Sequence, residues 1–373
     1  MKLIEAVIVI LFAVVLLQDV LHLLGRRALL YPFYIVLGLL LGPVITADAA
    51  EFLGKLGEFG FIFLLFLIGL EIELPDWREA GRALLLGIGW VLAHTVLLIP
   101  IGLHLGLSLE NTLICLTALT ACSVGMAHSS WEHFPHQSTH TKQRMLLWMV
   151  ALEVLAVLQF AAAEPLLENG LGWNSTLRLL LTVLTMVGVC WLAPKFARSL
   201  QIVIEITERW RLHFIVLLVL AAAAFGERLG LSAPKTAFFL GLFISRATHE
   251  SLALEKYLQP IGQNLLIPVF FIVLGLQVPL SSLWSVSGLW ALGTCVAMLL
   301  WRFLLYRAVF HRAIGDNSPG VFHLVGPNLS LVALAVHLLH KSDLAGPAVN
   351  WPILTGLLFT TASILLLPRP RPA

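Results

Sequence analysis

Long apolar runs separated by short polar segments extend along almost the whole chain. A transmembrane α-helix needs about 20 apolar residues to cross the hydrocarbon core, and shorter helices can span where neighbouring helices bury them. About thirteen segments fit this pattern, so the sequence predicts an all-α integral membrane protein. The predicted helices are Leu3–Leu23, Leu29–Pro43, Glu51–Ile72, Ala80–Leu105, Asn111–Ser129, Gln143–Ala163, Ser175–Ala197, Arg211–Phe225, Ala233–Arg246, Gln259–Gln277, Leu283–Arg307, Pro319–His340 and Asn350–Leu367.

The composition excludes a water-soluble fold. Of 373 residues, 59% are hydrophobic and 12% are charged, whereas an average soluble domain has about 25% charged residues. The net charge of +2 does not indicate a nucleic-acid partner, and no polar stretch is long enough for a soluble regulatory domain. The segment Met1–Leu24 superficially resembles a signal peptide, but its apolar run has spanning length and no small-residue cleavage site follows it. We interpret it as the first retained helix.

The positions of the 23 Lys and Arg residues predict the orientation, because cytoplasmic loops hold the excess of positive charge. Most of them lie after odd-numbered helices or at the C-terminus, as Arg26, Arg144 and Arg371 do. The opposite side holds Lys2, Lys55, Arg178, Arg228 and Lys341. We therefore expect a multi-pass membrane protein with its N-terminus outside and its C-terminus inside.

Motifs for enzymatic or cofactor chemistry are absent from the sequence. The cysteines Cys115, Cys122, Cys190 and Cys295 lie in apolar runs without CxxC spacing, which indicates neither a disulfide framework nor a metal site. No G-x-S-x-G, H-E-x-x-H or P-loop pattern occurs. We expect no enzyme, no cofactor and no ATP-driven pump.

Two predicted helices contain a weak point near the middle. The fifth reads Thr120-Ala-Cys-Ser-Val-Gly-Met126, with Gly125 as a candidate break, and the twelfth reads Leu324-Val-Gly-Pro-Asn-Leu-Ser330. Pro327 lacks a backbone donor, and Gly326 loosens the turn. In lipid, such breaks are tolerated only when they are buried in protein or line a cavity. A matching pair of broken helices is typical of transporters built from inverted repeats, and the alternative is that each break is a packing kink.

Glu153 is the clearest ionisable group inside a predicted span. It follows Arg144 by nine residues, which is about 14 Å along a helix and close to the membrane midplane. A charge at the membrane centre costs at least roughly 2.5 kcal/mol, so such groups are usually paired or functional. The alternative is a carboxylic acid that burial keeps neutral.

Arg302 in the eleventh span is the natural partner of Glu153. The alternative is that its long side chain snorkels to the interface, because Arg307 and Arg312 follow it toward the cytoplasm. Lys235 lies near the outer start of the ninth span and can reach water. The segment 128–140 contains four histidines, which permit metal binding or pH sensing, although its spacing is also that of a solvated linker.

Four segments together carry a resemblance to a known family: Gly57–Glu71, Glu227–Ser232, Ala237–Leu242 and Pro268–Leu276. With them, essentially the whole chain resembles the cation:proton antiporter superfamily, in particular the bacterial branch related to Kef-type potassium efflux and sodium/proton antiporters. The resemblance implies an inverted-repeat fold with crossed broken helices five and twelve. It also implies a homodimer.

The resemblance further implies a division of the helices by role. Helices one to three (1–78) and eight to ten (211–282) would form a scaffold for dimerisation, and helices four to six (79–170) and eleven to thirteen (283–373) a moving core. Helix seven (171–210) would link them. No soluble regulatory domain is expected.

The family's ion site maps onto this chain residue by residue. Glu153, Ser123 and Asn328 take the cation- and proton-binding positions, Arg302 compensates charge, and the breaks lie at Gly125, Gly326 and Pro327. The sequence also departs from the family pattern. Leu152 precedes Glu153 where relatives have a second polar residue, and Gly-Pro-Asn replaces a frequent Arg-Gly-Glu segment.

The expected function is therefore exchange of a monovalent cation, sodium or potassium, for protons. Because arginine cannot release its proton, Glu153 would be the one proton carrier, and exchange would be electroneutral. Two alternatives stay open at this stage. One is a transporter of this fold with a changed substrate, and the other is a non-transporting membrane subunit or sensor.

Overall fold

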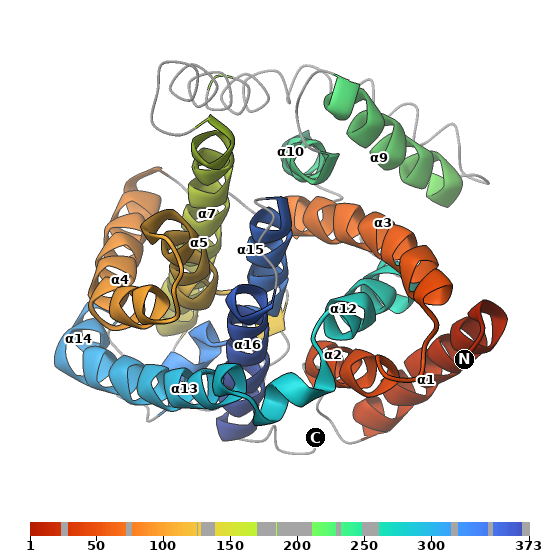
Figure 1. The fold of residues 1–373 in the computed structure, drawn as a ribbon. Helices are drawn as coiled ribbons and strands as arrows, with labels where there is room; N and C mark the ends of the chain where they lie inside the picture. The colour runs from red at the N-terminus through yellow and green to blue at the C-terminus, as the bar shows by residue number, and fades with distance from the viewer. Residues whose placement is uncertain are drawn as a thin grey trace. The chain divides into compact units, whose positions relative to one another are not determined.

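A computed structural model describes residues 1–23, 29–71, 77–124, 126–127, 139–169, 184, 211–228, 233–247, 261–314, 320–341 and 346–367. All regular elements within these ranges are helices (Figure 1). Nearly all of the predicted linker 171–210, with its helix Ser175–Ala197, lies outside the described residues, as do Gly125 and most of the histidine-rich segment 128–140. The chain divides into two compact units, which are described separately.

The first unit comprises Met1–Asp19, Tyr34–Glu73 and Thr176–Gln277. Its helices are most of α1 (Leu3–Leu23) and of α2 (Leu30–Leu41), α3 (Ala47–Glu71), α9 (Arg211–Arg228), α10 (Ala233–Ala247) and α12 (Ile267–Leu276), which a π-helical turn (Gly262–Leu266) precedes. Helix α3 is the centre of this unit, since both α10 and α12 pack against it. Figure 1 shows α12 between α2 and α3.

Glycines allow the helices of the first unit to approach closely. A Cβ atom at Gly38 of α2 would lie 2.0 Å from the Ile272 carbonyl oxygen of α12, and one at Gly275 would lie 2.2 Å from the Ile35 carbonyl oxygen. Small residues at helix contacts are typical of membrane proteins, where packing rather than the hydrophobic effect holds helices together. Gly38 and Gly275, the latter in one of the family-like segments, therefore have a packing role.

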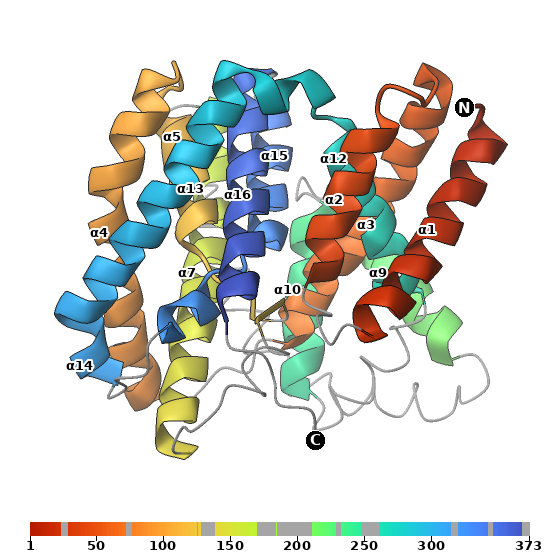
Figure 2. The same cartoon turned by 90° about the horizontal axis from the view of Figure 1, so that it is seen from below.

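The second unit comprises Val20–Phe33, Leu74–Ser175 and Val278–Ala373. Its helices are α4 (Trp77–His104), α5 (Leu109–Thr120), α7 (Thr139–Asn169), α13 (Val286–Leu305), α14 (His311–Ile314), α15 (Leu329–Lys341) and α16 (Pro347–Leu366). Helix α16 packs between α13 and α15, and α15 also contacts α5 (Figure 2). The window Val321–His340 is 94% buried, against 28% for Val286–Phe310, so α15 forms the centre of this unit and α13 part of its surface.

The prediction of an all-helical membrane protein is confirmed. Seven described helices are long and apolar enough to cross a membrane, and three shorter apolar helices accompany them. Large apolar side chains are exposed on several of them, including Phe12, Leu85 and Leu289, as expected for surfaces that contact lipid rather than water. The count of thirteen helices stays a prediction, because nearly all of the seventh lies outside the described residues.

Candidate ion-binding site

The fifth predicted helix is interrupted directly after Thr120. Helix α5 ends there, Ala121 is extended with φ −66° and ψ 166°, and its N–H donates to the Thr117 carbonyl. The chain is non-helical through Ser123, and helical structure resumes at Val124. The Thr120 hydroxyl donates back to the helix, 2.8 Å from the Leu116 carbonyl oxygen. The interruption therefore starts several residues before the candidate break at Gly125.

The twelfth predicted helix is also interrupted, at its Gly-Pro-Asn segment. A short 3₁₀ helix, Val321–Val325, ends at Gly326, and α15 begins at Leu329. Pro327 cannot continue the helical hydrogen bonds because it has no N–H. Gly326 is also close to α16, since a Cβ atom there would lie 2.1 Å from the Ser363 Oγ. Glycine is thus needed at position 326 for close packing, whereas its backbone angles, φ −77° and ψ −45°, are open to other residues.

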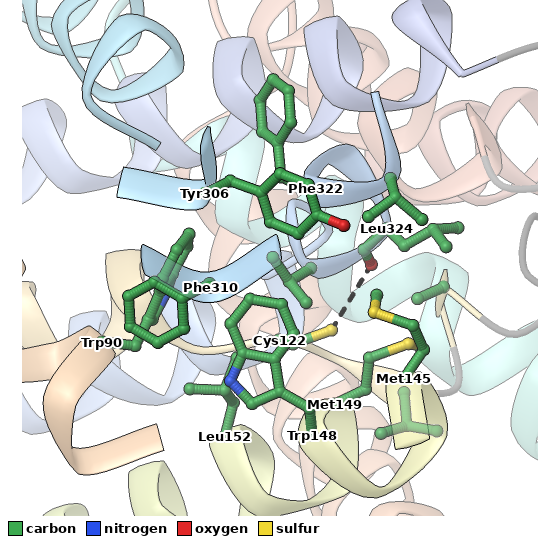
Figure 3. Close-up of a cluster of buried hydrophobic side chains, with 14 of the residues drawn as sticks. Trp90, Cys122, Met145, Trp148, Met149, Leu152, Tyr306, Phe310, Phe322 and Leu324 are labelled. Carbon is green, nitrogen blue, oxygen red and sulfur yellow. Dashed lines mark hydrogen bonds between the residues drawn. The ribbon is translucent and has the colours of Figure 1, made fainter. Parts of the chain in front are cut away.

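The two interruptions meet. The Ser123 N–H donates to the Pro327 carbonyl at 2.7 Å. The Cys122 thiol lies 3.6 Å from the Leu324 carbonyl oxygen, within hydrogen-bonding range for sulfur (Figure 3). Backbone groups that the breaks release are therefore satisfied inside the protein, which is the condition for non-helical backbone at membrane depth.

Glu153 lies beside this crossing. It is on α7, its side chain is 1% exposed, and its Oε2 accepts the Val124 N–H at 3.1 Å. Val124 is the first helical residue after the interruption of α5. Free N–H groups at the start of a helical segment favour a negative charge. The carboxylate is thus held at the point where the broken segment can stabilise its ionised form.

Arg302 contacts the carbonyl ends of the two helical segments that precede the interruptions. Its side chain is 0% exposed, Nη1 donates to the Val325 carbonyl at 2.7 Å, and Nη2 donates to the Leu119 carbonyl at 2.6 Å. Both carbonyls lie at the C-terminal ends of helical segments, where a cation is favourable. The aromatic rings of Trp90 and Phe359, at 5.4 Å and 4.4 Å from the guanidinium carbon, add cation–π contacts.

These contacts change the sequence-based interpretation of Arg302. The snorkelling alternative is wrong, because the side chain is fully buried. Its terminal nitrogens donate to backbone carbonyls rather than to the Glu153 carboxylate. Arg302 therefore compensates the partial negative charge of two helix ends.

Asn328 is fully buried, and both groups of its amide are hydrogen bonded. Its Nδ2 donates to the Leu119 carbonyl at 3.0 Å, and its Oδ1 accepts the Thr360 hydroxyl at 3.1 Å. The sequence brought Asn328 into the site but missed Thr360, because nothing in the sequence distinguishes it from the other two threonines of the apolar helix α16. The Leu119 carbonyl, which accepts from both Asn328 and Arg302, was equally invisible, since any residue type supplies a carbonyl.

An aromatic and sulfur-containing cluster surrounds the crossing (Figure 3). Trp90 is central, with its ring centroid 5.1 Å from that of Trp148 and 5.0 Å from that of Phe310. Leu152, where relatives have a polar residue, belongs to this cluster and is 1% exposed. Glu153 and the residues of this cluster are buried, so charge interactions there are stronger than in solution.

Comparison with known proteins agrees with this architecture. The family model described as sodium/hydrogen exchanger, transmembrane, matches residues 7–366. A probable Na⁺/H⁺ antiporter 3 of Methanocaldococcus jannaschii is 27% identical over 81% of this chain and 80% of its own length. The Na⁺/H⁺-K⁺ antiporter GerN of Bacillus cereus is 25% identical over 65% of this chain, which spans 64% of the GerN length.

A solved structure supports the fold independently. The sodium proton antiporter MjNhaP1 from Methanocaldococcus jannaschii, at pH 8, superimposes with a TM-score of 0.68 at 16% identity. The match covers 98% of this chain and 95% of that chain. At this identity the likeness shows the fold alone, whereas the family model covers nearly every residue. The chain therefore belongs to the transmembrane sodium/hydrogen exchanger family.

Proposed function

We propose that this protein exchanges a monovalent cation, sodium or potassium, for protons across a membrane, and that Glu153 carries the exchanged ion. One observation supports the assignment most directly. Glu153 is a buried carboxyl group whose Oε2 accepts the Val124 N–H where two interrupted helices cross. The names of the relatives as Na⁺/H⁺ antiporters point to the same substrates.

The proposed cycle needs one carboxyl group with two alternative occupants. Protonated Glu153 would release its proton on one side, and the resulting carboxylate would bind the cation. Ser123 would offer its hydroxyl oxygen as a further ligand, because it directly precedes Val124 in the interruption. Arg302 would keep its charge throughout and hold the carbonyl ends of the broken segments in place.

The exchange would be one proton for one cation. Arginine keeps its proton in proteins, and Leu152 and Asn328 have no ionisable group. Of the proposed site residues, Glu153 is then the one proton carrier. A cycle that exchanges equal charges moves no net charge, so it is electroneutral.

The remaining architecture is also a proposal. Residues 79–170 and 283–373 would form the moving core and residues 1–78 and 211–282 the scaffold of a homodimer, with 171–210 as linker. The grouping of α4, α5, α7, α13, α15 and α16 in one compact unit supports this division. The distribution of Lys and Arg supports an N-terminus outside and a C-terminus inside a bacterial cytoplasmic membrane.

The test is proton flux in liposomes that contain the purified protein and a pH-sensitive dye. Sodium, potassium and lithium gradients are imposed in turn on wild type and on Glu153→Gln. We expect proton movement with at least one of these cations in wild type and none in the variant. Absence of flux with all three cations in correctly folded wild type would contradict the proposal and favour a changed substrate or a non-transporting role.

A further inference from the structure

We propose that Thr360 is a positioning residue for exchange. Its hydroxyl holds the Asn328 amide in its orientation, and through that amide it fixes the end of α5 beside the ion site. Thr360 would not touch the cation or Glu153. The functional part of this inference rests on the proposed function, and a separate structural readout tests the hydrogen-bond chain itself.

The Thr360 hydroxyl makes two hydrogen bonds to one residue. Its Oγ1 accepts the Asn328 backbone N–H at 3.2 Å and lies 3.1 Å from the Asn328 Oδ1. An N–H can only donate, so the threonine oxygen accepts in the first contact and its single proton is available for the second. Both residues are 0% exposed, so bulk water does not reach either contact.

The Thr360 hydroxyl and the Leu119 carbonyl together hold the amide in one orientation. With Oδ1 held by the hydroxyl, Nδ2 faces the Leu119 carbonyl oxygen, 3.0 Å away. A flipped amide would place Oδ1 against that oxygen, and two acceptors would then face each other. The Leu119 carbonyl, which can only accept, therefore sets the amide orientation, and the Thr360 hydroxyl holds the amide in it by donating to Oδ1.

The Leu119 carbonyl also accepts from Arg302, at 2.6 Å. One carbonyl oxygen thus joins the asparagine that precedes α15 and the arginine of α13. The neighbour of Thr360, Phe359, places its ring 4.4 Å from the Arg302 guanidinium carbon. Consecutive residues of α16 therefore support both donors.

The chain of contacts leads to Glu153 through the backbone. Leu119 is the penultimate residue of α5, and Val124, which donates to Glu153, follows the short interruption. A displacement of the α5 end moves the N–H that stabilises the ionised carboxylate. Loss of the Thr360 hydroxyl should therefore change the competition between proton and cation at Glu153.

The matched control lies on the same helix. Thr355 of α16 is also 0% exposed, and its hydroxyl has no hydrogen-bond partner in the described part of the chain. Thr360→Val and Thr355→Val are thus the same substitution at equally buried sites of one helix. They differ in what is lost: the Thr360 hydroxyl makes two hydrogen bonds to Asn328, whereas the Thr355 hydroxyl makes none in the described part of the chain.

The experiment compares these variants in the liposome flux assay. For Thr360→Val we expect the cation KM to rise on the order of tenfold, because two buried polar groups lose their partner, together with a displaced pH profile. Thr360→Ser, which keeps the hydroxyl, should restore both values, and Thr355→Val should match wild type. Thr360→Cys has a weaker donor of similar size, so its KM and pH profile should lie between those of wild type and Thr360→Val. This variant also tests the proposal if Thr360→Val does not fold.

Hydrogen exchange at the backbone amides of residues 119–124 tests the chain of contacts even if wild type shows no flux. Exchange there should be faster in Thr360→Val than in Thr355→Val. Equal exchange in the two variants would overturn the proposal, whatever the flux. An unchanged KM and pH profile in an active Thr360→Val protein would also overturn it and leave Thr360 a packing residue.

Discussion

Glu153 and Arg302 contact the two sides of the same helix interruption. Glu153 accepts the Val124 N–H after the break at 3.1 Å, and Arg302 donates to the Leu119 carbonyl before it at 2.6 Å. The Glu153 carboxylate thus lies at the N-terminal end of a helical segment and the Arg302 guanidinium at the C-terminal end of another, as helix dipoles favour. Because the Arg302 terminal nitrogens bind carbonyls, Glu153 can gain or lose a proton without breaking a bond to Arg302.

Shortening the Glu153 side chain should slow exchange, whereas neutralising it should abolish exchange. Glu153→Asp keeps an ionisable group but moves it away from the Val124 N–H, so we expect a reduced rate and a higher cation KM. Glu153→Gln keeps the shape and an acceptor oxygen but cannot release a proton. The measurement is cation-driven proton flux in liposomes, with thermal melting to show that both variants are folded. Flux retained in folded Glu153→Gln would falsify the role of Glu153.

The cation KM should depend on pH. Lowering the pH equally on both sides protonates Glu153 and leaves fewer carboxylates for the cation, so KM should rise as pH falls. Saturating cation should restore the rate, because the two ions compete for one group. The measurement is initial flux against cation concentration at several pH values. A KM independent of pH would mean that proton and cation bind at separate groups.

Replacing Arg302 should destabilise the protein. Arg302→Ala removes two charge-assisted hydrogen bonds, each contributing about 1.5–3 kcal/mol, and leaves the Val325 and Leu119 carbonyls without this donor. Arg302→Lys keeps the charge but not the fork of donors, so an intermediate Tm is expected. Arg307→Ala on the following turn is the control, since Arg307 is exposed. Equal melting of the Arg302→Ala and Arg307→Ala proteins would contradict this prediction.

A side chain at position 326 should disturb the crossing. In Gly326→Ala the new Cβ would lie 2.1 Å from the Ser363 Oγ and 2.3 Å from its Cβ, and such overpacking costs typically about 1–3 kcal/mol. Ser363→Gly should relieve most of the clash in the double variant and leave a 2.9 Å contact with the His323 carbonyl oxygen. Gly89→Ala, where a Cβ meets nothing within 4 Å, should melt like wild type. A stable Gly326→Ala protein with normal flux would show that α16 yields easily at this point.

Exchange should not respond to membrane voltage. One proton and one monovalent cation carry equal charge, so a complete cycle moves no net charge. The measurement is proton flux in liposomes in which an ionophore and a gradient of an ion that the protein does not exchange set the potential, with no gradient of pH or of the exchanged cation. We expect no flux above that of protein-free liposomes. Voltage-driven flux would reveal a second charge carrier beside Glu153.

Much of the fold could be predicted from the sequence, because spanning length and apolar composition are local properties. The predicted first helix, Leu3–Leu23, has the bounds of α1, and the weak point that contains Pro327 is a real interruption. Glu153 also stood out locally, since a carboxyl group in an apolar run must be buried or paired. The sequence by itself thus determined an all-helical membrane protein and its candidate carboxylate.

The tertiary structure alone decided how the broken segments are held. Leu119 and Asn328 are 209 residues apart in sequence, yet their hydrogen bond joins α5 to the residue before α15. Hydropathy reports whether a residue is buried but not which carbonyl has lost its helical donor. From the sequence alone, Arg302 is therefore expected to be a partner of Glu153, and Thr360 to be an ordinary helix residue. Both roles arise from backbone groups brought together by folding, and no side-chain pattern encodes them.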